Sequence, residues 1–166
     1  MESRTYCTVV RIVTMKIGWD EYQDVMDGVD ALLDKGIARE DQLYVTGGSA
    51  GGIMTAWIIG KNTRFRAAAV VKPVMNWISK TLTADNYFYY ANYRYPGQPW
   101  ENVEGFMRHS PVTLVGNIET PTLVMVGTAD MRTQSADYQG RSYPRLVCEV
   151  PTEVGQLPIC IAVPRV

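Results

Sequence analysis

The chain contains the residue types of a nucleophilic catalytic site, with one of them in an unexpected place. Ser49 stands in "VTGGSAGG", residues 45–52, with glycines on both sides. Asp130 follows much later, and the sole histidine, His109, precedes that aspartate. A serine hydroxyl is a weak nucleophile at neutral pH unless a base activates it. The sequence therefore raises two questions: what positions Ser49, and which base serves it.

The stretch from Gly47 to Gly51 matches the pattern G-x-S-x-G. In this pattern a serine is held on a sharp turn between a strand and a helix, and its hydroxyl points away from the sheet. Glycines at positions 47 and 51 remove side chains that would collide in such a turn. The N–H of Ala50, at the start of the helix, is then placed to face a developing oxyanion. The pattern favours a nucleophilic Ser49 over an incidental serine in a glycine-rich turn.

The elements on either side supply the strand and the helix that the pattern requires. Residues 42–47 predict a short buried strand, and residues 53–61 predict a helix that is apolar nearly all round and therefore buried. Residues 67–74, ended by Pro73, and residues 120–127 predict two further strands. Strands that alternate with helices are typical of a parallel α/β sheet. We expect three or four parallel strands.

A first helix precedes these elements, over residues 19–35. Acidic residues near its start and Lys35-Gly36 near its end suit the helix dipole and the capping of a helix. Its apolar side chains recur at helical spacing and form one stripe: Tyr22, Val25, Met26, Val29, Leu32 and Leu33.

Asp130 comes just after the strand predicted at 120–127. Because the carboxyl ends of parallel strands meet at one edge of a sheet, we expect Asp130 and Ser49 to share that edge. The order serine, then aspartate, is the order of the α/β-hydrolase fold, in which a histidine follows the acid.

An aromatic segment separates the second and third predicted strands. It lacks a clean period and predicts short helices and loops that cover one face of the sheet. Ordinary packing and an aromatic-lined substrate pocket both explain it. Residues 77–106 hold nine of the chain's 17 aromatic side chains: Trp77, Tyr87, Phe88, Tyr89, Tyr90, Tyr93, Tyr95, Trp100 and Phe106.

Composition limits the classes of function. The chain has 166 residues, 46% of them hydrophobic, and a formal net charge of −1, which disfavours a disordered chain and a nucleic-acid binder. No apolar run approaches the roughly 20 residues that span a bilayer, and the first 15 residues make a poor secretory signal. Cys7, Cys148 and Cys160 are odd in number and lack metal-ligand spacing. We expect free thiols, a cytoplasmic location, no membrane partner, and no metal or other cofactor.

Four segments, in this order, carry a resemblance to a known family: "EYQDVMDGVDALLDKG", "LYVTGGSAGG", "TAWIIGKNTRFRAAAVVKPVMNW" and "TPTLVMVGTADMRT". Over about residues 18–138 the chain resembles the catalytic domain of the prolyl oligopeptidase family, and its acylaminoacyl-peptidase-like serine peptidases in particular. The resemblance implies a partial α/β-hydrolase fold, with a mostly parallel sheet and flanking helices. It also implies a peptide substrate.

The resemblance also implies roles for single residues. Ser49 is the nucleophile, the Ala50 N–H is half of the oxyanion hole, and Asp130 is the acid that orients a histidine. Arg132 matches an arginine that binds a substrate carbonyl in some members of the family. A surface salt bridge explains Arg132 equally well.

The chain departs from the family in its base and at its two ends. The family's histidine follows the acid, whereas no histidine follows Asp130 here, and His109 lies in a segment that forms a structural Ser-Pro turn in the family. We expect three parts: an N-terminal segment of residues 1–17 with at most one strand, near residues 7–14; a partial catalytic domain of residues 18–138; and an atypical tail of residues 139–166 with at best a strand near 145–150. The chain is expected to be a truncated form of a longer enzyme.

The sequence predicts a serine-type peptidase of this family whose activity is impaired because no histidine follows the acid. Two alternatives remain: a non-catalytic remnant or binding module, and an esterase-type serine hydrolase, since the serine motif does not distinguish esters from amides. We also expect the strand at 42–47 to leave an open sheet edge through which the chain associates with itself.

Overall fold

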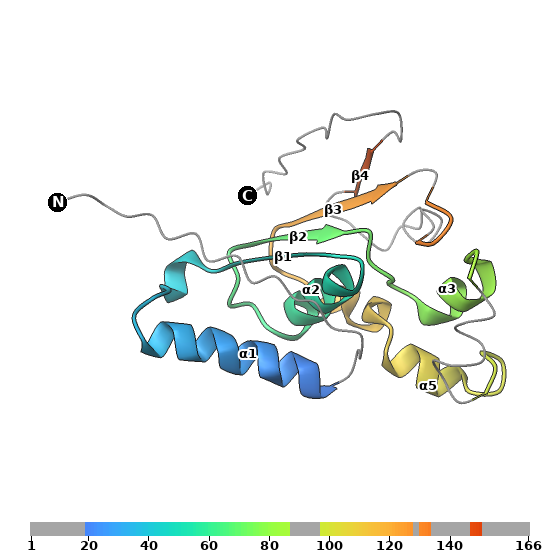
Figure 1. The fold of residues 1–166 in the computed structure, drawn as a ribbon, viewed down its shortest axis with the longest axis horizontal. Helices are drawn as coiled ribbons and strands as arrows, with labels where there is room; N and C mark the ends of the chain where they lie inside the picture. The colour runs from blue at the N-terminus through green and yellow to red at the C-terminus, as the bar shows by residue number, and fades with distance from the viewer. Residues whose placement is uncertain (1–18, 87–96, 128–129, 134–146, 151–166) are drawn as a thin grey trace.

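A four-stranded parallel sheet forms the centre of the chain (Figure 1). The computed structural model describes residues 19–86, 97–127, 130–133 and 147–150. The strands follow one another in chain order: β1 (Tyr44–Gly48), β2 (Ala67–Val71), β3 (Thr122–Gly127) and β4 (Val147–Val150). The parallel α/β sheet expected from the sequence is confirmed, and so is the strand expected near 145–150.

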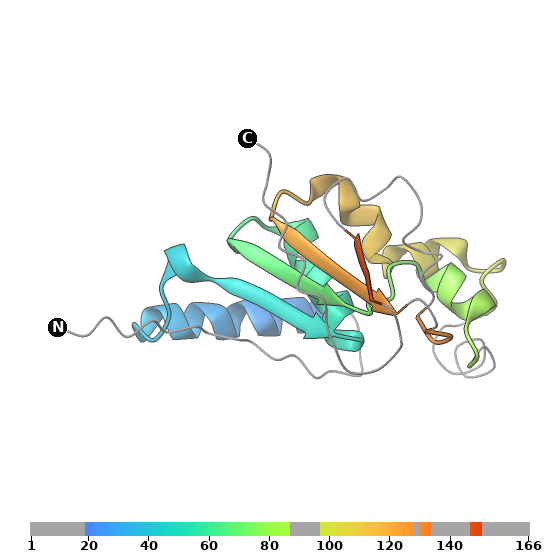
Figure 2. The same cartoon turned by 90° about the horizontal axis from the view of Figure 1, so that it is seen from above.

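Two long helices lie on one side of this sheet (Figures 1 and 2). The first, α1 (Trp19–Asp34), confirms the predicted helix, and Met26 and Val29 on its apolar stripe are buried. Its end is marked by Gly36, which has a positive φ of 65° that glycine adopts readily.

The second helix, α2 (Ala50–Lys61), is buried over its whole length from Gly51 to Gly60. Beside the sheet, it contacts α1 and a 3-10 helix, η3 (Pro111–Asn117). Ile58 and Ile59 are almost wholly inaccessible to water, and burial of such a side chain contributes about 1.5–3 kcal/mol. The apolar sequence of α2 was therefore a correct sign of a buried helix, and this helix anchors the turn that precedes it.

Two predicted strands differ from the observed ones in their bounds. The strand predicted at 42–47 begins two residues later, because the 3-10 helix η1 (Glu40–Gln42) takes up its first residue, and Tyr44 is 44% exposed rather than buried. The strand predicted at 67–74 ends at Val71, before Pro73. There Lys72 adopts a positive φ of 39°, which turns the chain out of the sheet.

The aromatic segment is helical where the structure describes it, as α3 (Trp77–Thr83) and α5 (Val103–Arg108). These two helices lie beyond the carboxyl end of the sheet rather than over one of its faces, which differs from the expectation for the described part of the segment (Figures 1 and 2). Trp77 and Phe106 are buried together with Ile53 of α2, which favours packing as their role, whereas Trp100 is 64% exposed.

Several expectations fall on residues outside the described ranges. They concern the strand near residues 7–14, the six aromatic residues from 87 to 95, and most of the tail. Among the described residues, no helix is both long and apolar enough to cross a membrane.

The open edge of β1 leads to a prediction about association. In the described sheet β1 pairs with β2 alone, and an unpaired strand edge is a template for pairing with another chain. We propose that the chain expressed alone is insoluble or self-associated, and that Tyr44→Lys, which places a charge on this edge, reduces the association measured by light scattering.

Ile37→Lys is the matched control. Ile37 is also a large apolar side chain, 51% exposed, but it lies outside the strands, so this variant should associate like the unaltered chain. A monodisperse monomer with a cooperative thermal transition would contradict the prediction.

Candidate active site

Ser49 lies on a sharp turn between β1 and α2. Its φ of 57° and ψ of −118° are unusual for a residue with a side chain and cost on the order of 1–3 kcal/mol. The turn is held in place because the Ser49 N–H donates to the Val71 carbonyl of β2 at 2.9 Å, and the Ser49 carbonyl accepts from the Ile53 N–H of α2 at 3.0 Å. The strain is thus fixed by hydrogen bonds to the strand beside it and to the helix after it.

The hydroxyl of Ser49 is not used to cap the helix. Serine is a preferred residue at the position before a helix because its oxygen accepts a backbone N–H there. Ser49 occupies this position but makes no such capping bond, and the residue is exposed. A serine that is strained, exposed and not engaged in capping is the arrangement expected of a nucleophile on this kind of turn.

Glycines let the backbone of this turn pack closely. A β-carbon on Gly47 would lie 2.3 Å from the carbonyl oxygen of Gly51, so these two positions account for the close approach that the motif predicts. A β-carbon on Gly52 would lie 2.5 Å from the Val71 oxygen. The sequence motif missed Gly52, although the doubled glycine after Ala50 was a visible signal for it.

Ala50 is the first residue of α2. The first N–H groups of a helix have no acceptor within the helix, and the helix dipole makes this end partly positive. The arrangement can stabilise an oxyanion that forms on a carbonyl attacked by Ser49. The oxyanion role of Ala50 stays a prediction.

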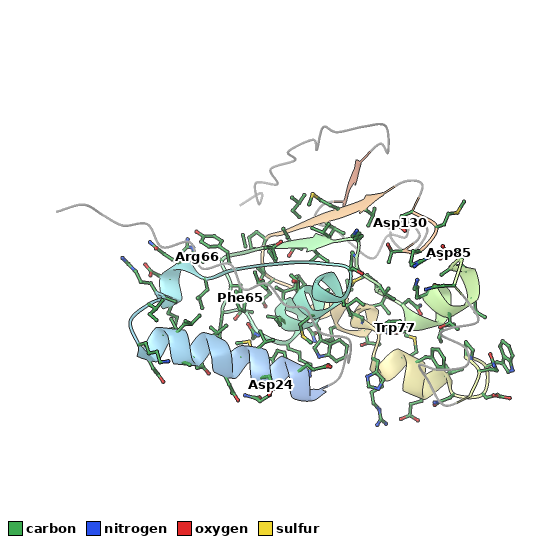
Figure 3. The ribbon with its side chains drawn as sticks, in the orientation of Figure 1. Asp24, Phe65, Arg66, Trp77, Asp85 and Asp130 are labelled. Atoms are coloured by element: carbon green, nitrogen blue, oxygen red, sulfur yellow. The ribbon has the colours of Figure 1, made fainter. Side chains whose placement is uncertain are left out.

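Asp130 begins a short loop, residues 130–133, that we call the acid loop. Its N–H donates to the Gly127 carbonyl at the end of β3, and its carboxylate accepts from the N–H groups of Arg132 at 2.8 Å and Thr133 at 2.9 Å. The Thr133 hydroxyl donates to the same carboxylate at 2.6 Å. Figure 3 shows Asp130 beyond the carboxyl end of the sheet.

The hydrogen bonds on Asp130 determine its charge. Partial burial raises the pKa of its carboxyl group, but the bonds from Thr133 and Arg132 and the positive charge of Lys72 outweigh this effect, so the pKa lies below the ordinary value. Asp130 is therefore ionised at neutral pH, as the acid of a catalytic triad must be.

Ser49, Lys72 and Asp130 follow three adjacent strands. Since β1, β2 and β3 are parallel and in register, these residues leave the sheet at the same edge. Ser49 and Lys72 are also the two non-glycine residues with positive φ in the described part of the chain. Such strain is concentrated at functional sites. No local pattern in the sequence singles out Lys72.

Arg132 pairs with Asp85, just after α3. The guanidinium Nε and Nη2 each donate to one carboxylate oxygen of Asp85 at 2.9 Å. The sequence left two roles open for Arg132, and the structure contains the salt bridge. The binding of a substrate carbonyl stays a prediction. Asp85 was missed because its contact with Arg132 joins residues 47 positions apart.

His109 is tied to the end of α5 rather than to the acid. The backbone N–H of His109 donates to the Phe106 carbonyl, and the next residue, Ser110, is wholly buried. The Ser110 hydroxyl donates to the Phe106 carbonyl at 2.8 Å and accepts from the Trp77 N–H at 3.0 Å. This is the geometry of a structural Ser-Pro turn, which joins α5 to α3.

The close packing at Gly47 predicts a large difference between two neighbouring substitutions. Gly47→Ala forces a methyl group against backbone and should lower the free energy of unfolding by about 3 kcal/mol or prevent folding. Gly48→Ala is the matched control, because its β-carbon meets nothing closer than 4.0 Å and should change stability by less than about 0.5 kcal/mol. Urea unfolding measures both, and equal effects would contradict the assigned packing.

The lowered pKa of Asp130 predicts how stability depends on pH. A carboxyl group whose pKa is lower in the folded state contributes stability above its ordinary pKa of 3.8, and this contribution is lost as the pH falls through the folded value. Asp130→Asn should lower the urea midpoint of unfolding at pH 7. The difference between the urea midpoints at pH 7 and pH 3 should be smaller in this variant than in the unaltered chain.

Asp24→Asn is the control for this titration, since Asp24 is an exposed carboxylate on α1, far from Asp130 (Figure 3). This variant shows how the loss of one carboxylate outside the acid loop changes the difference in urea midpoint between pH 7 and pH 3. If Asp130→Asn changed this difference no more than Asp24→Asn does, the hydrogen bonds assigned to Asp130 would be wrong.

Known proteins are similar to this chain in sequence. The chain is 35% identical over 124 residues to the peptidase YuxL of Bacillus subtilis, covering 74% of this chain and 19% of that protein. It is 32% identical over 147 residues to the acylamino-acid-releasing enzyme of Arabidopsis thaliana, covering 84% of this chain and 19% of the relative. The chain thus spans about a fifth of the length of these relatives.

A solved structure shares the fold. The acylaminoacyl peptidase of Pyrococcus horikoshii superposes with a TM-score of 0.72 at 22% identity, over 84% of this chain and 24% of that one. The model of the prolyl oligopeptidase family matches residues 10–138, which is most of the chain. The strained serine, the acid at the same sheet edge and this match lead to one conclusion: the chain belongs to the prolyl oligopeptidase family.

Proposed function

We propose that the chain carries the nucleophile and the acid of a serine-type peptidase that cleaves short or N-acylated peptides. Ser49 is the nucleophile, Ala50 supplies one oxyanion donor, and Asp130 orients a histidine. The observation that carries this proposal is the strained, exposed Ser49, whose hydroxyl does not cap the helix that it precedes. Membership of the family and the peptidases among the relatives support it. A cytoplasmic location belongs to the same proposal.

The mechanism would need a histidine base, and no histidine follows Asp130 in these 166 residues. In this family of reactions a histidine takes the proton of the serine as the serine attacks the carbonyl, and returns it to the leaving amine. Asp130, ionised and held by three hydrogen bonds, is suited to orient that histidine. The one histidine of the chain, His109, precedes the acid and is part of the Ser-Pro turn.

A second candidate function follows from the same observation. A chain that keeps the turn and the acid but lacks a base after Asp130 is also suited to bind a peptide without cleaving it. We retain this non-catalytic role as the alternative. Ester hydrolysis by Ser49 is a further variant of the first proposal.

The isolated chain should have negligible peptidase activity. Loss of one triad member lowers the rate by about 10⁴- to 10⁶-fold, and no lysine follows Asp130 to serve instead. The measurement is turnover of an N-acetylated peptide by the chain and by Ser49→Ala, with Ser79→Ala as the control serine. The prediction fails if the chain cleaves the peptide and Ser49→Ala abolishes cleavage, and His109→Ala would then identify the base.

A fluorophosphonate probe separates the two candidate functions. Slow labelling that is lost in Ser49→Ala and kept in Ser79→Ala supports a nucleophile that lacks only its base. Equal labelling of all three proteins supports the non-catalytic alternative.

A further inference from the structure

The acid loop is fastened to the end of α3 by side chains that the catalytic proposal does not use. Lys80, in the last turn of α3, donates from Nζ to the Arg132 carbonyl and to the Asn86 side-chain oxygen. The N–H of Asp85 donates to the Met131 carbonyl at 3.2 Å. Backbone groups of the loop are therefore bound by residues that lie some 50 positions earlier in the chain.

Lys80 is buried to an extent that is unusual for its type. Only 4% of the residue is exposed, and lysine is rarely buried unless its ammonium group finds partners. Here a backbone carbonyl of the acid loop and a side-chain amide oxygen serve as such partners. The bond to the Arg132 carbonyl offsets part of the cost of burying this charge, and it joins α3 to the acid loop.

The Asp85–Arg132 pair adds a second attachment. It is bidentate, with both distances at 2.9 Å, a geometry that fixes the orientation of the two side chains. Arg132 also donates its own N–H to Asp130, so the residue held by Asp85 is one that bonds to the acid. Figure 3 shows Asp85 and Asp130 close to each other at this end of the fold.

We propose that Asp85 and Lys80 are positioning residues that hold the acid loop, and with it the carboxylate of Asp130, at the sheet edge shared with Ser49. The inference deepens the proposed function, because the position of this loop matters for catalysis only if Asp130 is the acid. It implies that α3 is part of the active-site framework, although none of its residues contacts the reacting atoms.

The charges around Asp130 make the idea testable without activity. Asp85 and Asp130 repel each other, so removal of the Asp85 charge alone would lower the pKa of Asp130. Loosening of the acid loop would weaken the hydrogen bonds from Thr133 and Arg132 and so raise that pKa. The positive charge of Lys72 also lowers this pKa, and the substitution leaves it in place. The cations of Arg132 and Lys80, which lie beside Asp85, remain as well.

The experiment is a carboxyl-carbon NMR titration of Asp130 in the full chain. Magic-angle spinning of sedimented protein suits soluble and self-associated chains alike, and loss of the signal in Asp130→Asn assigns it. We expect Asp85→Ala and Asp85→Asn to raise the titration midpoint of Asp130 toward the ordinary pKa of 3.8. Asp85→Glu keeps the charge and should leave the midpoint close to that of the unaltered chain.

Asp41→Ala is the matched control. It removes an exposed bidentate pair, Arg39–Asp41, with distances of 3.0 and 2.8 Å and no contact with the acid loop, and should leave the Asp130 midpoint unchanged. A downward shift or no shift in the Asp85 variants would overturn the proposal. So would unfolding of both Asp85→Ala and Asp85→Asn, because a pair that acts on one loop does not hold the whole fold. Neither result bears on peptide cleavage, so the proposed function can fail or stand independently.

Discussion

The backbone of Ser49 is held in a conformation that costs an ordinary residue on the order of 1–3 kcal/mol, and its neighbours are arranged to keep it there. The strand before it and the helix after it approach so closely that glycine is needed at position 47. The carbonyl of Val71, in the next strand, accepts the Ser49 N–H. The carbonyl of Ser49 accepts the Ile53 N–H of the buried helix α2, which ties the turn to this helix.

The parallel sheet brings the remaining candidate site residues to the same edge as this turn. Because β1, β2 and β3 run in the same direction, the residues that follow them share an edge, although they come from distant parts of the sequence. The acid loop is held by hydrogen bonds to the carboxylate of Asp130 and to the end of β3, and contacts from Lys80 and Asp85 attach it to the end of α3. The candidate site therefore rests on two attachments: the serine turn on β2 and the acid loop on α3.

Much of this arrangement could be predicted from the sequence, for physical reasons that differ between residues. The apolar stripe of α1 and the uniformly apolar α2 were reliable because burial follows directly from side-chain type. The turn at Ser49 was recognisable because its close backbone packing requires glycines at fixed positions around the serine. Contacts between distant residues leave no such sign, and so the contacts of Arg132 with Asp85 and of Lys80 with the acid loop could not be predicted. The positive φ of Lys72 occurs where the chain leaves β2, and no local sequence pattern predicts it.

The central claim is that Ser49 is presented for nucleophilic attack and needs a base. Free imidazole can supply that base, so the most direct measurement is hydrolysis of a p-nitrophenyl ester at increasing imidazole concentration, compared between the chain and Ser49→Ala. The account predicts that imidazole raises the rate of the chain above that of Ser49→Ala, by an amount that grows with concentration. Equal rates for the two proteins at every imidazole concentration would contradict it.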